Sequence, residues 1–235
     1  MIEALPASYA STRDALHALA EQVVAPARYQ AERHIGLAPT PGGFGTPMFG
    51  DGERVRVDGV ELVHERPGTS TRIGITTLTA AAQFVDVPLG VPADVYTSVI
   101  DYPPDAPLAV RVDGARALAT WYEFAATVLD ELRATYAAHE PSGSTIWPEH
   151  FDLACELGSA GAGTRANYGA SPGDGGIDQP YLYVGPWDAG RRIGALAAYP
   201  FGAAITYDEL LASGDARGRA LEFCFEGAAL LVGAP

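Results

Sequence analysis

The side chains best suited to chemistry gather in residues 147–187. Within this segment, residues 150–157 alternate between polar and apolar side chains, as expected of a strand with one buried face. The polar phase carries His150, Asp152 and Glu156, an imidazole next to two carboxylates. Such a set can bind a polar ligand or transfer protons, with His150 as the acid or base and Asp152 orienting it.

Two further strand-like runs follow, at residues 165–171 and 181–184. If the three strands are neighbours in a sheet, their polar phases share one face. A guanidinium there would pair with an anionic group of a ligand, and two phenols would form a wall. The predicted site therefore consists of catalytic His150 and Asp152 with ligand-binding Glu156, Arg165, Asn167, Tyr181 and Tyr183. The competing interpretation is a solvated strand face with ordinary ion pairs.

The opposite phase of the first run is apolar and predicts a core face. It contains Phe151, Leu153, Cys155 and Leu157, so Cys155 is expected to be buried and not a nucleophile. The second cysteine, Cys224, also lies in an apolar run. Two cysteines in 235 residues do not make a disulfide framework.

A metal-dependent hydrolase is an alternative function, because His150 and Asp152 could chelate a metal with Glu156 or Asp174 as a further ligand. The sequence has no HExxH motif and no second histidine close to His150. The glycine- and aspartate-rich loop at residues 172–180 lacks the spacing of a calcium loop, and we expect a turn there. No metal is predicted.

Cofactor motifs are missing from the sequence. It has no Walker A motif and no GxSxG elbow, and the glycines at residues 158–163 precede an extended run where a dinucleotide loop would open a helix. The chain contains no lysine, which excludes Schiff-base chemistry and attachment of pyridoxal phosphate. We therefore predict no cofactor.

Composition limits the class of protein. Hydrophobic residues make up 48% of the chain and charged residues 19%, which is enough apolar material for a core. With 29 acidic and 15 basic residues the net charge is -14, and this weighs against nucleic acid and anionic membranes as partners. No apolar run is long enough to span a membrane and no signal peptide is visible, so we expect a cytoplasmic protein. The sequence does not predict the oligomeric state.

The pattern predicts an α+β fold with antiparallel sheet segments packed against three or four helices. The clearest helix covers residues 115–138, and others are expected at residues 11–24, 77–85 and 217–232. A hairpin turning at Asp58-Gly59 would set Arg56 opposite Glu61. The proline-rich residues 87–107 predict a long connection. We also expect Pro26 to end or bend the first helix, residues 29–37 to run on as a strand, and residues 39–45 to form a loop.

The segment Pro141–Ser144 has the composition of a linker and is the best candidate for a domain boundary. It would separate an α+β half at residues 1–140 from a second at residues 141–235. Both halves run from strands to a helix, which is compatible with two similar units. One continuous domain is the alternative.

Several short motifs resemble a family of actinobacterial proteins of unknown function. These are TRDALH near the N-terminus, HFDLA at residues 150–154, the SPGD loop and PYLYVGPW at residues 180–187. The chain lacks the aromatic, histidine-rich early strand of that family. The resemblance implies a cytoplasmic α+β protein and no particular chemistry.

The leading hypothesis is therefore a cytoplasmic protein or enzyme that binds a small polar molecule at the strand face around His150. A non-catalytic protein-interaction module is the second hypothesis, in which acidic loops meet a partner and the polar strand face is plain surface. The metal-dependent hydrolase is the third.

Overall fold

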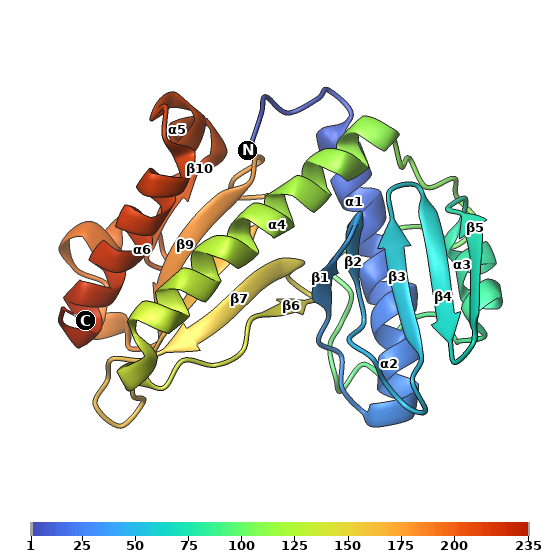
Figure 1. The fold of residues 1–235 in the computed structure, drawn as a ribbon, viewed down its shortest axis with the longest axis horizontal. Helices are drawn as coiled ribbons and strands as arrows, with labels where there is room; N and C mark the ends of the chain where they lie inside the picture. The colour runs from blue at the N-terminus through green and yellow to red at the C-terminus, as the bar shows by residue number, and fades with distance from the viewer. Residues whose placement is uncertain (1, 235) are drawn as a thin grey trace. The chain divides into compact units, whose positions relative to one another are not determined.

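The computed structural model describes residues 2–234 and has an α+β fold, as predicted (Figure 1). It contains two five-stranded antiparallel sheets, with strand orders β1-β2-β3-β4-β5 and β10-β9-β8-β7-β6. The chain divides into two compact units. The N-terminal unit comprises Leu5–Tyr122 and Ile146–Phe151, and the C-terminal unit comprises Met1–Ala4, Glu123–Thr145 and Asp152–Pro235.

The N-terminal unit is built on the first sheet, and helices cover one of its faces (Figure 1). Val55 and Leu62 on that face are fully buried, as are Leu19 and Val23 of the helices, so this is the core. The strands are β1 (Ala38–Thr40), β2 (Gly43–Gly45), β3 (Arg54–Asp58), β4 (Glu61–Arg66) and β5 (Thr69–Gly74), and the helical elements are α1 (Tyr9–Leu19), η1 (Ala20–Val24), α2 (Ala25–Glu32) and α3 (Leu78–Val85).

The first helix does not end at Pro26, and the strand expected from residue 29 does not begin there. The helix passes through a π-helical turn, η1, and continues as α2, with the proline in the first turn of α2. Proline has no N–H for the carbonyl of Gln22, and that carbonyl instead accepts the N–H of Gly90 at 2.9 Å. The wider turn and this distant donor let the helix run through the position, so residues 29–32 are helical.

Two hairpins of the first sheet differ from the sequence-based expectation. Residues 39–45, expected to be a loop, form most of the β1–β2 hairpin, whose Gly45 pairs with Arg56 where a Cβ would have no room. In the β3–β4 hairpin Asp58 pairs with Glu61 and Arg56 with Val63, so the expected pairing of Arg56 with Glu61 is wrong by two residues. The turn is Gly59-Val60, and a positive φ of 61° at Gly59 fits a type II′ turn.

The C-terminal unit is built on the second sheet. Val184 and Leu182 of β9 lie on its core face, where Gly227 of α6 packs against Val184 so closely that a Cβ would not fit. Tyr168 and Cys155 lie on the same face and are buried. The strands are β6 (Thr145–Trp147), β7 (Asp152–Leu157), β8 (Ala166–Ser171), β9 (Tyr181–Pro186) and β10 (Ala203–Thr206), followed by α5 (Tyr207–Ala212) and α6 (Ala216–Val232).

The long helix predicted around residues 115–138 is present as α4 (Val112–Thr135). Its first part, to Tyr122, belongs to the N-terminal unit and the rest to the C-terminal unit. Leu118, Val128 and Leu132 of its apolar stripe are buried, as the helical spacing predicts.

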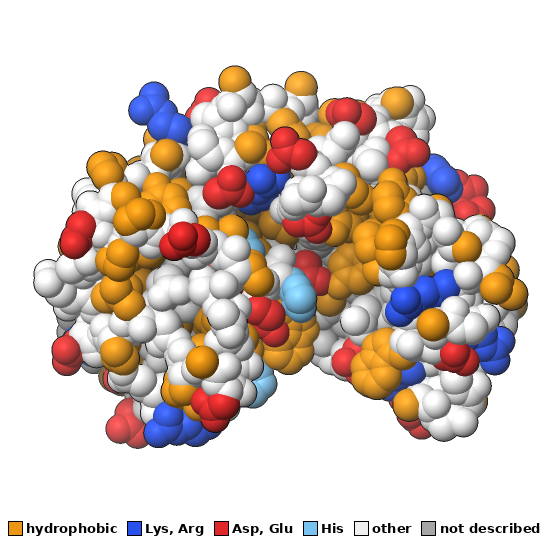
Figure 2. Space-filling model, turned by 180° about the vertical axis from the view of Figure 1, so that it is seen from behind, with side chains coloured by type: hydrophobic (Ala, Val, Ile, Leu, Met, Phe, Trp, Pro, Cys, Tyr) orange, Lys and Arg blue, Asp and Glu red, His pale blue; other side chains and the backbone are white. Residues whose placement is uncertain are grey.

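No helix among residues 2–234 is long and apolar enough to cross a membrane. On the face shown in Figure 2, acidic side chains are dispersed, and basic side chains form small groups between them.

Candidate functional site

The predicted polar face exists on the second sheet, on the side away from α6. Antiparallel pairing sets Glu156 opposite Asn167 and Gly169 opposite Tyr183. Because side chains alternate along each strand, one face carries five of the seven predicted site residues. They are Asp152, Glu156, Asn167, Tyr181 and Tyr183.

A hydrogen bond between Tyr183 and Asp152 is the centre of this face. Tyr183 is on β9 and Asp152 on β7, so the phenol must cross the intervening strand β8. It crosses at Gly169, where an added Cβ would collide with the Tyr183 ring and hydroxyl. The Tyr183 hydroxyl donates to Oδ2 of Asp152. The glycine in β8 thus lets the Tyr183 side chain reach across from β9 to β7.

Both partners of this hydrogen bond are withdrawn from water, Asp152 almost completely and Tyr183 in part. Asp152 is only 6% exposed. Burial, and next the negative charge of Asp152, raise the pKa of Tyr183 well above its ordinary value of 10. The phenol therefore stays protonated and remains a hydrogen-bond donor at neutral pH.

A second tyrosine–aspartate pair lies next to the first. The Tyr181 hydroxyl donates to Oδ2 of Asp174 at 2.6 Å, and burial again raises the tyrosine pKa above 10. Asp174 itself is exposed, and its Oδ1 accepts the N–H groups of Gly176 and Ile177 at 2.7 and 3.0 Å. The glycine- and aspartate-rich loop is thus a turn, as predicted.

Aromatic side chains that sequence reasoning missed pack around these tyrosines. The Phe201 ring lies 6.1 Å from Tyr181, 6.0 Å from Tyr183 and 5.3 Å from Tyr199, between ring centroids. Residues 199–201 precede β10 and gave no strand or helix signal. Gly169 did carry a usable signal, because a glycine inside a strand often marks a close approach by another group.

The other predicted binding residues are already engaged by the protein. Arg165 donates to Glu156 through Nε at 3.0 Å and through Nη2, and to the carbonyl of Gly158 at 2.9 Å. Asn167 accepts the indole N–H of Trp187 at 2.8 Å. The part of the face around Arg165, Glu156 and Asn167 therefore matches the competing interpretation, a strand face with ordinary ion pairs. The Arg165 guanidinium is not available to an anionic ligand.

His150 does not lie on the strand, which corrects its expected place on the polar face. β7 begins at Asp152, and Phe151 just before it has a left-handed φ of 54°, so strand alternation does not extend back to His150. His150 is exposed in a turn of the N-terminal unit, whereas Asp152 belongs to the C-terminal unit. His150 and Asp152 therefore do not share a strand face, which was the basis for expecting Asp152 to orient His150.

The turn that carries His150 is held by a histidine from the first helix. His17 stacks on Phe151 with ring centroids 4.9 Å apart, and its Nε2 contacts the carbonyl oxygen of Pro148 at 2.8 Å. Burial lowers the pKa of His17 to about 4, so the ring is neutral at pH 7 and Nε2 donates the hydrogen bond. This role is structural, and the spacing of histidines in the sequence gave no indication of it.

A buried glutamate in the π-helical turn is a further feature that sequence reasoning missed. Glu21 is fully buried and accepts hydrogen bonds from the Ser98 hydroxyl and from the N–H groups of Val99 and Ile100. The Tyr96 hydroxyl donates to the backbone carbonyl of Glu21 at 2.6 Å. Burial raises the pKa of the Glu21 carboxyl. Glu21 thus fixes part of the long connection to the helix.

The described residues contain no ligand set for the metal-dependent hydrolase that was the alternative function. Within residues 2–234, no three His, Cys, Asp or Glu side chains are grouped so that they could hold a metal ion. His150, Asp152 and Glu156 therefore do not form the triad that this alternative required. Cys155 and Cys224 are buried, and burial raises both thiol pKa values to about 12, which makes them poor nucleophiles.

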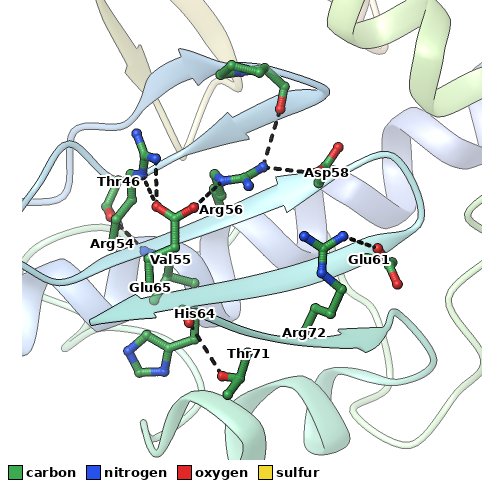
Figure 3. Close-up of polar contacts among 11 residues, drawn as sticks. Thr46, Arg54, Val55, Arg56, Asp58, Glu61, His64, Glu65, Thr71 and Arg72 are labelled. Atoms are coloured by element: carbon green, nitrogen blue, oxygen red, sulfur yellow. Dashed lines mark hydrogen bonds and ion pairs between the residues drawn. The ribbon is translucent and has the colours of Figure 1, made fainter. Parts of the chain in front are cut away.

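The N-terminal unit carries a ladder of ion pairs on the outer face of its sheet (Figure 3). Glu65 lies between two guanidinium groups, accepting from Nε of Arg54 at 2.6 Å and from Nε of Arg56 at 3.0 Å. Arg56 also pairs with Asp58 at 3.1 Å. These side chains form ion pairs with one another, so we interpret the ladder as stabilising the sheet and not as a binding site.

No protein-family model, curated protein or solved structure matches this chain. The resemblance to the actinobacterial family therefore stays a prediction.

Proposed function

We propose that this chain binds a small polar molecule at the face formed by Asp152, Tyr183, Tyr181 and Phe201. The observation that carries the proposal is the Tyr183–Asp152 hydrogen bond laid across Gly169. The other face of the same sheet provides the core, so folding does not require a buried carboxylate here. A buried charge is costly unless it is hydrogen-bonded, and perturbed groups of this kind cluster at functional sites.

The chemistry of the face favours a ligand with hydroxyl or amino groups. Asp152 and Asp174 are acceptors, the two phenols donate to them, and Phe201 adds an apolar surface beside the phenols. Arg165 is engaged by Glu156, so among the residues that the structure describes no free guanidinium on this face would attract a carboxylate or phosphate. Aromatic rings combined with carboxylates suit polyols, sugars and amines.

The proposal is for binding, and it assigns no catalytic step. The acid–base role expected of His150 rested on a strand alternation that begins only at Asp152. A cytoplasmic location, as expected from the sequence, is part of the proposal.

Equilibrium dialysis of the full chain against a mixture of sugars, polyols, amino sugars and amino acids, read by mass spectrometry, tests the proposal. We expect at least one of these compounds to be retained by the wild type and lost from both Asp152→Asn and Tyr183→Phe. Asp130→Asn, an exposed carboxylate of α4, is the control and should retain it. Retention that is equal in all four proteins, or no retention by the folded wild type, would contradict the proposal.

A further inference from the structure

A cavity of about 310 Å³ lies in the N-terminal unit, away from the ion-pair ladder. It is formed where the last turns of α2, the C-terminal end of α3 and the loop before β3 meet the end of β4. This volume is at the lower end of the roughly 300–1,000 Å³ typical of small-molecule sites. About half of the lining is apolar, and the polar part consists of Gln30, Glu53, His64, Arg66 and Asp86.

His64 forms the buried polar wall of this cavity. Its backbone pairs with Val55, which puts the ring on the side of the sheet opposite to Glu65 and the ladder (Figure 3). The ring is nearly inaccessible, with the residue 4% exposed, and its Nε2 lies 2.9 Å from Oε2 of Glu53. A buried histidine therefore fixes a carboxylate at the edge of the cavity.

Only one oxygen of Glu53 is used by the protein. Nε of Arg66 donates to the same Oε2 at 3.2 Å, and none of the residues that the structure describes hydrogen-bonds to Oε1. The hydrogen bond from His64 and the pairing with Arg66 lower the pKa of the Glu53 carboxyl. Glu53 is thus ionised at neutral pH and has one oxygen available to a ligand.

Two further polar groups of the lining have no partner among the described residues. Asp86 is exposed and ends α3 in the left-handed conformation, with a φ of 64°. Its carboxylate forms no hydrogen bond or ion pair there, and neither does the Gln30 side chain of α2. The lining thus has two carboxylates against one guanidinium, and that guanidinium is already paired with Glu53.

We propose that this cavity binds a small organic cation, an ammonium or guanidinium group on a short aliphatic body. The cation would meet Oε1 of Glu53 and the carboxylate of Asp86, and the aliphatic body would contact the apolar walls. An excess of acceptors and of negative charge favours such a donor over an anion. The chain has no lysine, so no ammonium group of its own side chains competes for the site. This site is independent of the one on the second sheet.

Isothermal titration calorimetry on the full chain tests the charge of the ligand. The probes are butylammonium, 1,4-butanediammonium and butylguanidinium, compared with butanol and butyrate at the same pH and ionic strength. We expect at least one cation to bind at least tenfold more tightly than butanol or butyrate. Binding of butyrate or butanol as tight as that of every cation would overturn the proposal, as would no binding of any cation by the folded chain.

Single substitutions test the location. Asp86→Asn should weaken cation binding at least fivefold, and asparagine tolerates the left-handed backbone of this position. Glu53→Gln should do the same. Glu61→Gln, a carboxylate of β4 paired with Arg72 on the outer face, is the matched control and should bind like the wild type.

Circular dichroism of each variant verifies folding, and Asp86→Asn carries the test if Glu53→Gln does not fold. Cation affinity unchanged in the folded variants would overturn the proposal. Tyr183→Phe should leave cation affinity unchanged, so failure of this site and failure of the site on the second sheet can be distinguished.

Discussion

At the scale of single residues, Tyr183 and Asp152 depend on each other because the carboxylate is buried and the phenol is half-buried. The carboxylate needs the phenol as a donor, and the phenol reaches it only because β8 has a glycine at the crossing point. Each of these three residues can be changed separately, and each change has a distinct expected consequence.

Replacing Tyr183 by phenylalanine keeps the ring and removes the donor to Asp152. We expect a loss of about 1–3 kcal/mol in the free energy of unfolding, because a buried acceptor loses its partner. Urea unfolding at pH 7 measures it. Tyr199→Phe is the control, since the Tyr199 hydroxyl forms no hydrogen bond with any described residue, and it should change stability by less than about 0.5 kcal/mol. Equal effects of the two substitutions would show that the Tyr183–Asp152 hydrogen bond does not stabilise the folded chain.

Gly169→Ala places a Cβ against the Tyr183 ring. Because the strand on each side fixes the backbone, we expect a loss of about 1–3 kcal/mol from overpacking. Gly185→Ala on β9 is the matched control, since its Cβ would meet only ordinary contacts, the nearest at 3.4 Å from the carbonyl oxygen of Phe201. Thermal unfolding followed by circular dichroism compares the two, and a more stable Gly169→Ala protein would show that the ring is free to move aside.

His17 predicts how stability changes with pH. Its pKa is about 4 in the folded chain and 6.5 when exposed, so between these values the unfolded chain binds the proton more tightly. The contribution of His17 is therefore fully present above pH 6.5 and is lost as the pH falls toward 4, with a loss of about 2 kcal/mol at pH 5. The raised pKa of Glu21 acts in the opposite direction, because protonation there favours the folded chain.

Urea unfolding of the wild type and of His17→Phe at pH 7.5 and pH 5.0 isolates the histidine. Phenylalanine keeps a ring to stack on Phe151 but cannot titrate. We expect the wild type to lose about 2 kcal/mol more than the variant between the two pH values. His150→Gln, at an exposed position, should behave like the wild type. The same pH dependence in wild type and His17→Phe would mean that His17 is not held neutral by burial.

At the scale of elements, the π-helical turn links the first helix to the long connection between α3 and α4. Glu21 on that turn accepts two backbone N–H groups of residues 98–100, and the Gln22 carbonyl accepts a third from Gly90. These contacts give order to a proline-rich segment that has no helix or strand of its own.

Glu21→Ala should release this segment locally. We expect the Val99 and Ile100 amides to exchange with deuterium at least tenfold faster, because each loses its hydrogen-bond acceptor. The Leu108 amide, which donates to the carbonyl of Thr76 at 2.8 Å, is an internal control in the same sample and should keep its rate. Equal acceleration at all three amides would indicate general destabilisation and would exclude a local role for Glu21.

Sequence periodicity predicted the elements whose patterns are local. The long helix α4 follows from local spacing and is present. The caps seen in the structure, Thr77 at α3 and the Thr206–Glu209 capping box at α5, likewise join residues only three apart. Strand alternation likewise placed Asp152, Tyr181 and Tyr183 on one face. It failed at His150, because nothing in the sequence marks the left-handed backbone of Phe151.

Features that depend on distant partners could not be predicted. Pro26 normally ends a helix, and the helix continues here because Gly90, far along the chain, donates to Gln22. The predicted hairpin turn was misplaced by one residue, and the partner of Arg56 by two, because both Asp58-Gly59 and Gly59-Val60 are plausible turns. Glu21 gave no signal, since a glutamate in an amphipathic helix is usually exposed.

At the scale of the whole molecule, the net charge of -14 should oppose folding through repulsion between acidic groups. Salt screens charges separated by more than about 10 Å at 0.1 M. We therefore expect the urea midpoint at pH 7 to rise when NaCl is increased from 20 to 500 mM. A falling midpoint would mean that ion pairs such as those of the β3–β4 ladder contribute more than the general repulsion costs.

The central claim is that a small polar molecule contacts the tyrosines of the second sheet. ¹³C NMR of chain labelled at Cζ of tyrosine, titrated with the compound retained in dialysis, tests it most directly. Resonances assigned through Tyr183→Phe and Tyr181→Phe should shift in a saturable manner, while that of Tyr29 in α2 should not. If the compound binds and the Tyr183 and Tyr181 resonances stay in place, the claim is contradicted.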